Sequence, residues 1–126
     1  MDFPKELKYT KDHEWVRIQG AMAAIGITEF AQSELGDLVF VDLPAIGKVV
    51  KQGETLCVVE STKAASDVYC PVGGKVIEVN TALKDSPDLV NKDSYLKGWL
   101  VKLSEPNSAD LAKLMDAESY GKLVGK

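Results

Sequence analysis

Short apolar-rich segments separated by turn residues run along most of this chain. Glu14–Ile18 and Ala21–Ile27 are two such segments, and Gln19-Gly20 between them is typical of a tight β-hairpin. Further strands are predicted at Leu38–Leu43 (closed by Pro44), Lys48–Lys51, Lys75–Asn80 and Trp99–Leu103. The spacing of these strands indicates an all-β chain whose neighbouring strands run antiparallel.

Helical signals are brief and lie between or after the strands. Thr28 is predicted to cap a short helix that carries Phe30, Ala31 and Leu35, with Gly36 as its stop. Ser86-Pro87 is predicted to be a cap followed by proline at the first helical position. Near the end of the chain, Ser108 is predicted to open a helix with Leu111, Leu114 and Met115 on one face, and Asp116 to cap a further turn bearing Tyr120 and Leu123.

Residues 56–70 form the most symmetric part of the chain. Folding this segment about the bond between Lys63 and Ala64 predicts the cross-strand pairs Ser61–Ser66, Val59–Val68 and Cys57–Cys70 on one face, and Glu60–Asp67 and Val58–Tyr69 on the other. Both faces then change from apolar at the base to polar at the tip, although two carboxylates directly opposite each other are destabilising. Lys63 occupies the apex between small residues.

An exposed lysine in a turn has an ordinary interpretation, which is that it only keeps the surface solvated. An ordinary lysine amine is protonated at neutral pH and is a weak nucleophile, and no apolar run beside Lys63 supplies the burial that would change this. Lys63 is therefore a poor catalytic lysine. It is a good attachment point for an enzyme that brings its own activated acyl group.

Composition excludes several classes of function. The 126 residues fit one domain with an ordinary apolar fraction of 45%, and the net charge of −4 argues against nucleic acid or an anionic membrane as the main partner. One histidine, His13, without a Cys-x-x-Cys motif gives no basis for a metal site. The start of the chain lacks the features of a signal peptide or presequence, so we expect a cytoplasmic protein whose two cysteines are free thiols.

The residues around Lys63 resemble the lipoyl-attachment segment of the glycine cleavage system H proteins. The resembling stretch is Glu60-Ser61-Thr62-Lys63-Ala64-Ala65-Ser66-Asp67-Val68-Tyr69 followed by Pro71-Val72-x-Gly74. Further similar motifs are Leu7-Lys8-Tyr9, His13-Glu14-Trp15, Gly26-Ile27-Thr28-Glu29-Phe30-Ala31-Gln32, Leu35-Gly36-Asp37, Val39-Phe40-Val41-Asp42-Leu43-Pro44, Asn80-x-x-Leu83, Ser86-Pro87-x-Leu89-Val90-Asn91 and Gly98-Trp99-Leu100. The resemblance covers nearly the whole chain.

This resemblance implies a carrier protein of glycine catabolism and one-carbon metabolism rather than an enzyme, with no catalytic residue of its own. Lipoate would be joined to Lys63 as N6-lipoyllysine by a lipoate-attaching enzyme. The lipoamide would accept the aminomethyl group from glycine decarboxylase (P protein), present it to the tetrahydrofolate-dependent aminomethyltransferase (T protein), and be reoxidised by dihydrolipoamide dehydrogenase (L protein). The bond-breaking and redox steps would be carried out by the cofactors of these partners. We expect the carrier itself to be a monomer.

The resemblance also points to residues beyond Lys63. Glu14 and Asp67 would bind the ammonium group of the loaded arm, with Asp12 as a weaker candidate, and the alternative for each is an ordinary solvated acid. Glu60 and Gly74 would serve recognition by the lipoate-attaching enzyme. Glu60 has the alternative of keeping the tip soluble, and Gly74 that of adopting a positive φ in a Gly-Gly turn.

The chain departs from the family pattern at a few positions. Glu34 stands where relatives often have histidine, and Cys57 and Cys70 stand where small apolar residues are usual. These departures leave the role of residue 34 and the redox behaviour of the thiols open.

The expected fold is a two-sheet antiparallel sandwich of the lipoyl/biotinyl (barrel-sandwich hybrid) kind, as one domain over residues 1–126 with a C-terminal helical extension at about 108–124. Three alternative functions remain. A lipoyl relay protein, which hands its lipoyl group to other apoproteins, would have almost the same sequence. A biotin carrier is disfavoured because Thr62 and Ala64, rather than methionines, flank Lys63, and a Schiff-base enzyme because a hairpin tip offers no pocket.

Overall fold

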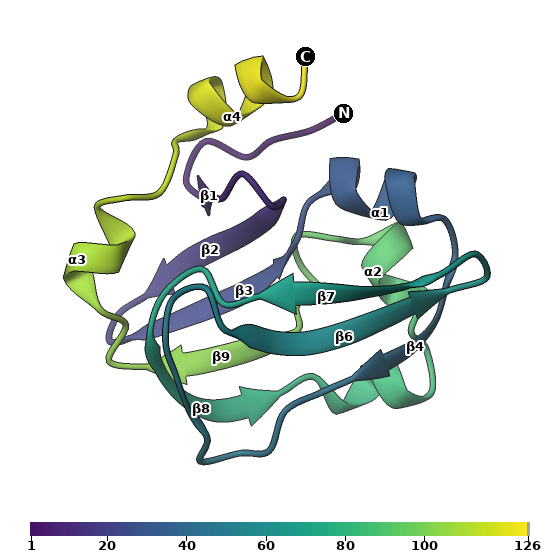
Figure 1. Ribbon diagram of the computed structural model, residues 1–126, viewed down its shortest axis with the longest axis horizontal. Coiled ribbons are helices and arrows are strands. Elements are labelled where there is room, and N and C mark those ends of the chain that lie inside the picture. Colours follow the sequence, from purple (N-terminus) through teal and green to yellow (C-terminus); the bar gives the residue numbers. More distant parts are fainter. Residues whose placement is uncertain (126) are drawn as a thin grey trace.

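Antiparallel strands make up the body of the molecule, and short helices lie around it (Figure 1). The computed structural model describes residues 1–125. Its strands are β1 (Lys8–Tyr9), β2 (Glu14–Gln19), β3 (Met22–Ile27), β4 (Leu38–Asp42), β5 (Val49–Val50), β6 (Thr55–Ser61), β7 (Ala65–Tyr69), β8 (Gly74–Val79) and β9 (Val101–Ser104). Its helices are α1 (Glu29–Leu35), the 3₁₀ helix η1 (Thr81–Lys84), α2 (Leu89–Lys92), α3 (Ser108–Leu111) and α4 (Ala117–Leu123).

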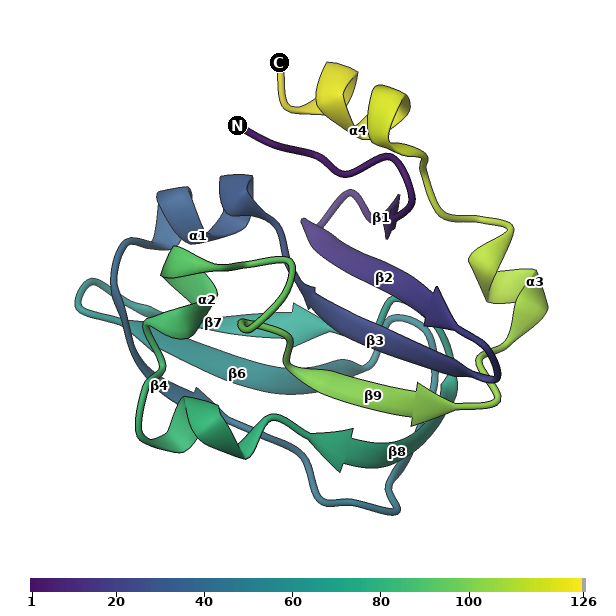
Figure 2. The ribbon, with the colours of Figure 1, turned by 180° about the vertical axis from the view of Figure 1, so that it is seen from behind.

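The strands form two sheets that lie face to face. The larger has the order β1-β2-β3-β9-β8-β5 and the smaller the order β4-β6-β7, and the strand pairs in both sheets are antiparallel. The smaller sheet lies in front in Figure 1 and the larger in front in Figure 2. The predicted two-sheet antiparallel sandwich is confirmed.

The main core lies between the inner faces of the two sheets. Val16 and Ile25 pair across β2 and β3 and project inward, where they join Val59 of β6 and Val68 of β7 in one buried cluster. Burying one such side chain contributes about 1.5–3 kcal/mol before entropy is counted. Alternate residues of β2 therefore point into the sandwich, and Glu14 shares the inward face with Val16.

A second, aromatic cluster covers the outer side of the larger sheet. Trp15 alternates with Val16 and packs there with Tyr9, Tyr95 and Tyr120. The Tyr9 and Tyr120 rings stack with centroids 4.8 Å apart, and the N-terminal segment and α4 lie side by side over β1 and β2 in both views (Figures 1 and 2). The two ends of the described chain thus close the same side of the sandwich.

The predicted strands match the observed ones to within two residues at each end, and the helix capped by Thr28 is confirmed. Thr28 Oγ1 accepts a hydrogen bond from the Ala31 N–H, and Gly36 ends α1 with a φ of 82°. β1 and η1 were not predicted, because two-residue strands and single 3₁₀ turns leave almost no pattern. Among residues 1–125, no helix has both the length and the apolar character needed to cross a bilayer.

Two helix predictions were wrong. The helix expected from Ser86-Pro87 begins at Leu89, after a turn in which the Val90 N–H bonds to the Pro87 carbonyl. The C-terminal helix ends at Leu111 and does not carry Leu114 or Met115. Met115 is extended instead, and its backbone exchanges two 2.8 Å hydrogen bonds with Tyr9. An extended residue paired in this way cannot continue a helix. A new helix, α4, then starts after Asp116, as predicted, and the Asp116 side chain accepts from the Ser119 N–H.

The β6–β7 hairpin has the predicted faces but a different register. Val59 pairs with Ser66, Cys57 with Val68, and Val58 with Asp67, so each partner is displaced by two residues and the turn is centred between Thr62 and Lys63. A displacement of two keeps every side chain on its face. It also places Glu60 opposite Ala65, which removes the direct pairing of Glu60 with Asp67. The predicted cross-strand pairing of the two cysteines was wrong for the same reason.

Candidate functional site

Lys63 lies at the tip of the β6–β7 hairpin with its side chain exposed. The turn is fixed by Ser61, whose N–H donates to the Ala64 carbonyl and whose Oγ accepts from the backbone N–H groups of Lys63 (3.1 Å) and Ala64 (3.2 Å). Within residues 1–125, the ion pairs join other side chains and do not include Lys63. The amine is thus presented on a turn with a defined backbone, and it has no internal counter-ion in the described part of the chain.

The Lys63 side chain lies over the end of α1. A Cβ at Gly36 would be 3.6 Å from Cε and 3.8 Å from Nζ of Lys63, so the aliphatic stem passes the helix terminus closely. Asn91 of α2 holds this terminus, since its amide donates to the Gly36 carbonyl and its Oδ1 accepts from the Leu38 N–H, each at 2.9 Å. The Thr62 N–H also donates to the Asp37 carbonyl, which ties the hairpin tip to the segment after α1.

A cleft opens beside this contact, between α1 and the end of the sandwich. It has a volume of about 270 Å³ and is lined by Asp12, His13, Glu14, Ile27, Phe30, Ala31, Glu34, Leu35, Val59, Ser66, Asp67 and Val68. Leu35 lines the cleft and directly precedes Gly36, the residue that the Lys63 side chain lies against. An arm extending from Lys63 over Gly36 therefore meets an apolar cleft with acidic groups.

Glu14 is the buried carboxylate of this cleft, with 2% of its surface exposed. Its Oε1 accepts from the Thr10 hydroxyl, and its Oε2 lies 3.4 Å from the Tyr69 N–H. Burial raises the pKa of Glu14 to about 7, and the hydrogen bond from Thr10 opposes this rise. The alternative of an ordinary solvated acid was wrong for Glu14, because the residue faces inward with Val16.

Three further carboxylates surround the cleft with exposed side chains, namely Asp12, Glu34 and Asp67. His13 lies among them, and its ring is 4.8 Å from that of Phe30. Burial lowers the pKa of His13 below its ordinary value, while Asp12 and Glu34 act in the opposite direction. The described residues that line the cleft include four carboxyl groups and no lysine or arginine, and this lining suits a bound cation.

The two candidate recognition residues lie in different places. Glu60 is exposed on the outer face of the smaller sheet, next to the tip, between its cross-strand neighbours Phe40 and Ala65. Gly74 begins β8, at the end of the sandwich opposite the β6–β7 turn (Figure 1). It does not have a positive φ, so the Gly-Gly turn interpretation was wrong. The space is the constraint, because a Cβ at Gly74 would lie 2.9 Å from the Ser104 carbonyl oxygen.

Both cysteines are buried free thiols. Burial raises the pKa of Cys57 to about 12 and that of Cys70 to about 11, and the Cys70 thiol donates to the Val72 carbonyl at 2.9 Å. Because the thiolate is the reactive form, burial disfavours reaction of both cysteines at neutral pH.

Sequence reasoning named Lys63, Glu14, Asp67 and, as a weaker candidate, Asp12, but did not predict the other residues that line the cleft. Phe30, Ala31 and Leu35 were predicted only as helix residues, and Glu34 only as a departure from the family pattern. Their shared signal is the 3.6-residue period of α1, which places residues 30, 31, 34 and 35 along one side of the helix. The helical period alone does not indicate which strands α1 packs against.

Comparisons with known proteins agree with this arrangement. A family model described as "Glycine cleavage H-protein" matches residues 7–126. The chain is 54% identical over 117 residues to a glycine cleavage system H protein of Symbiobacterium thermophilum (93% of this chain, 91% of that one), and 49% identical over 124 residues to one of Bacteroides fragilis (98% of each). It also matches the crystal structure of a glycine cleavage system H protein from Mycobacterium marinum, with a TM-score of 0.90 and 41% identity over 98% of this chain and 100% of that one. The expected kind of fold is thereby confirmed, and the chain belongs to the glycine cleavage H-protein family.

Proposed function

We propose that this chain is a lipoyl carrier of the glycine cleavage system, with lipoate joined by an amide to Nζ of Lys63. When bound, the lipoyl disulfide accepts an aminomethyl group as glycine loses carbon dioxide, gives that group to tetrahydrofolate with release of ammonia, and is restored from the dithiol by a dehydrogenase that reduces NAD. The residues present fit this prosthetic group, since the Lys63 amine is exposed on a fixed turn. The observation that carries the proposal is that this amine lies against Gly36, which directly follows Leu35 of the carboxylate-lined cleft.

The partners would be glycine decarboxylase, the aminomethyltransferase, dihydrolipoamide dehydrogenase and a lipoate-attaching enzyme. Tethering raises the effective concentration of the arm at each partner without a tight complex. In this proposal the chain acts as a cytoplasmic monomer, one domain over its whole length, without catalytic residues. It contributes position, charge and exclusion of water.

The cleft would hold the loaded end of the arm. The aminomethyl cargo carries an ammonium group at neutral pH, and Glu14 with Asp67 at the rim would bind it. A nearby cation favours the ionised form of a carboxyl group, so docking would lower the pKa of Glu14 from about 7 and release its proton. Ile27, Phe30 and Val59 would exclude water from the bound group.

Glu60 would serve recognition by the lipoate-attaching enzyme, because an enzyme that reaches Lys63 also covers its exposed neighbours on the outer face. Gly74 is too far from the tip, at the opposite end of the sandwich, to be contacted together with Lys63 by a small binding site. A role for Gly74 in recognition would therefore act through the packing of β8 against β9.

The test is reconstitution with purified components. The chain is incubated with a lipoate ligase, ATP and lipoate, and is then combined with glycine, tetrahydrofolate, NAD and the three partner enzymes. We expect formation of NADH that requires the lipoylated chain and is lost with the unmodified chain. If the lipoylated chain supports no NADH formation but passes its lipoyl group to other apoproteins, it is a relay protein and the proposal is wrong.

A further inference from the structure

Tyr120, near the end of the chain, contacts both walls of the cleft through one hydroxyl group. The Tyr120 hydroxyl lies 2.8 Å from His13 Nδ1 and 2.7 Å from Thr28 Oγ1. His13 belongs to the wall that leads into β2, and Thr28 caps α1, which forms the other wall. Tyr120 is 107 residues from His13 and 92 residues from Thr28 along the chain, so these hydrogen bonds join distant parts of the sequence.

The backbone of the His13 wall has a less common conformation. His13 has a φ of 73°, in the left-handed region that most residues avoid. The His13 carbonyl accepts from the Thr28 N–H at 3.0 Å, so the backbone of one wall is joined directly to the cap of the other. Glu14 follows His13 directly, and the direction of its carboxyl group therefore depends on this backbone conformation.

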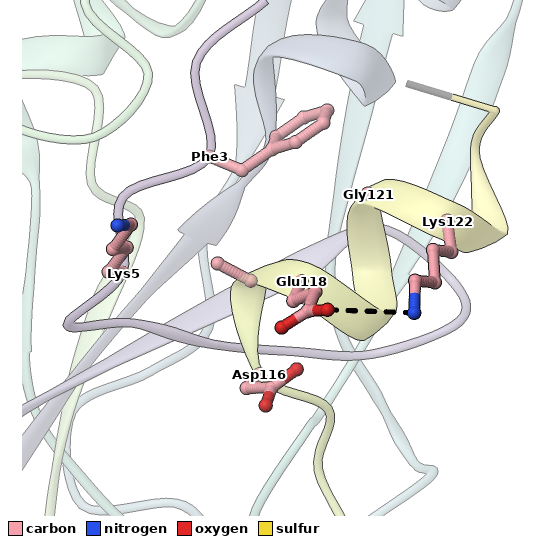
Figure 3. Close-up of a pocket in the computed structure, with 7 residues that line it drawn as sticks. Phe3, Lys5, Asp116, Glu118, Gly121 and Lys122 are labelled. Carbon is pink, nitrogen blue, oxygen red and sulfur yellow. Dashed lines mark ion pairs between the residues drawn. The ribbon is translucent and has the colours of Figure 1, made fainter.

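Tyr120 is itself held firmly. It has no exposed surface, its ring stacks on Tyr9, and the ring of Phe3 packs against it edge-on at 5.1 Å. Figure 3 shows Phe3 of the N-terminal segment directed toward α4, beside a hollow of about 640 Å³ whose rim carries the exposed pair Glu118–Lys122. The hydroxyl thus comes from a rigid aromatic cluster outside the sandwich.

We propose that Tyr120 is a positioning residue for the loaded arm: it clamps the His13 segment to the start of α1 and so fixes the cleft that receives the cargo. This inference rests on the function proposed above. Its consequence is that α4, which lies outside the sandwich, determines how well the cleft protects the cargo from water.

The test uses two substitutions and one matched control. Tyr120→Phe removes the hydroxyl and keeps the stacked ring. His13→Asn removes the imidazole from the other side of the bond and keeps a residue that tolerates a positive φ. Tyr9→Phe is the control, because it removes one hydroxyl from the same aromatic cluster, a 2.6 Å bond to the Pro4 carbonyl, without touching the cleft. Thermal unfolding of each variant checks that it folds.

The first measurement needs no lipoate. In the unmodified chain we follow hydrogen exchange of the Thr28 amide and the NMR titration of His13, the one histidine of the sequence. Tyr120→Phe should speed exchange of the Thr28 amide about fivefold, as expected for a lost hydrogen bond, and should shift the His13 titration, whereas Tyr9→Phe should stay within about twofold of the unaltered chain.

The second measurement uses the lipoylated chain, loaded by the decarboxylase and glycine and then separated from it. Loss of the cargo to water should be about fivefold faster in Tyr120→Phe and in His13→Asn, and unchanged within about twofold in Tyr9→Phe. Equal lifetimes in all variants, with the cargo of the unaltered chain well protected, would overturn the clamp and leave the proposed function standing. If the unaltered chain loses its cargo as fast in the folded state as in urea, docking in the cleft is wrong, and the clamp with it.

Discussion

Glu14 links the pH dependence of stability to the proposed docking of the loaded arm. It faces inward because it alternates with Trp15 and shares a face with Val16, and its burial raises the pKa to about 7. A buried carboxyl group without a cation is favoured in its neutral form. The folded chain therefore holds a proton there at a pH where the unfolded chain does not. Such a cost is consistent with the proposed binding of a cation at this site.

Glu14→Gln should change the pH dependence of stability. Because the folded pKa lies above the ordinary 4.5, the contribution of Glu14 to stability is greatest below pH 4.5 and is lost as the pH rises through 7. Between pH 4 and 8 the free energy of unfolding of the unaltered chain should fall relative to that of Glu14→Gln by up to about 3 kcal/mol. Urea unfolding at a series of pH values measures this difference.

Asp12→Asn is the control for that experiment, since it removes the same charge from an exposed position of the same segment. Glu14→Gln should also shorten the lifetime of the loaded arm. Parallel stability curves for Glu14→Gln and the unaltered chain would show that the carboxyl group is not held neutral by burial.

At the scale of the element, the β6–β7 turn depends on Ser61. Its side chain is mostly buried, and its hydroxyl accepts from two backbone N–H groups of the turn. Ser61→Ala should lower the free energy of unfolding by about 1 kcal/mol and should speed hydrogen exchange of the Lys63 and Ala64 amides. Ser33→Ala, which removes an exposed hydroxyl from α1, should change stability by less than about 0.5 kcal/mol.

Lipoate attachment to Ser61→Ala should also be slower, because the tip no longer has one backbone conformation. Unchanged amide exchange at residues 63 and 64 would mean that the strand ladder alone fixes the turn.

Gly74 and Glu60 are expected to differ in what their substitution affects, which is stability for Gly74 and lipoate attachment for Glu60. Gly74→Ala adds a Cβ that would lie 2.9 Å from the Ser104 carbonyl oxygen, and such overpacking should cost about 1–3 kcal/mol. The folded Gly74→Ala chain should still be lipoylated at the normal kcat/KM. Glu60→Gln, at an exposed position, should show the reverse, with normal stability and a lower kcat/KM. A stable Gly74→Ala chain that is lipoylated poorly would assign Gly74 a direct role in recognition.

At the scale of the whole molecule, the sequence predicted which residues share a face of a strand pair better than which residues pair across the strands. Alternation in β6 and β7 predicted that Val59 shares a face with Val68 and Glu60 with Asp67, and the structure buries the first pair and exposes the second. The observed partners agree with the Ser61 hydroxyl bonds in the turn and with the cost of facing carboxylates, whereas the alignment of like residues predicted a register displaced by two. A similar limit applies after α3, where Met115 was predicted to be helical but pairs with Tyr9, over a hundred residues away.

The cleft was predictable only in part for a similar reason. Lys63, Glu14 and Asp67 come from local motifs, so the resemblance to the family located them. The walls are assembled from α1, the segment before β2 and the inner face of the smaller sheet, and Tyr120 joins two of them from the far end of the chain. Contacts between such distant segments leave no local period in the sequence.

The most direct test of the central claim is the intact mass of the chain after treatment with a lipoate ligase, ATP and lipoate, for the unaltered chain and for Lys63→Arg. The account predicts that the unaltered chain gains the mass of one lipoyl group and that Lys63→Arg, folded as shown by its circular dichroism spectrum, gains none. An unaltered chain of unchanged mass, or a Lys63→Arg chain that still gains a lipoyl group, would contradict it.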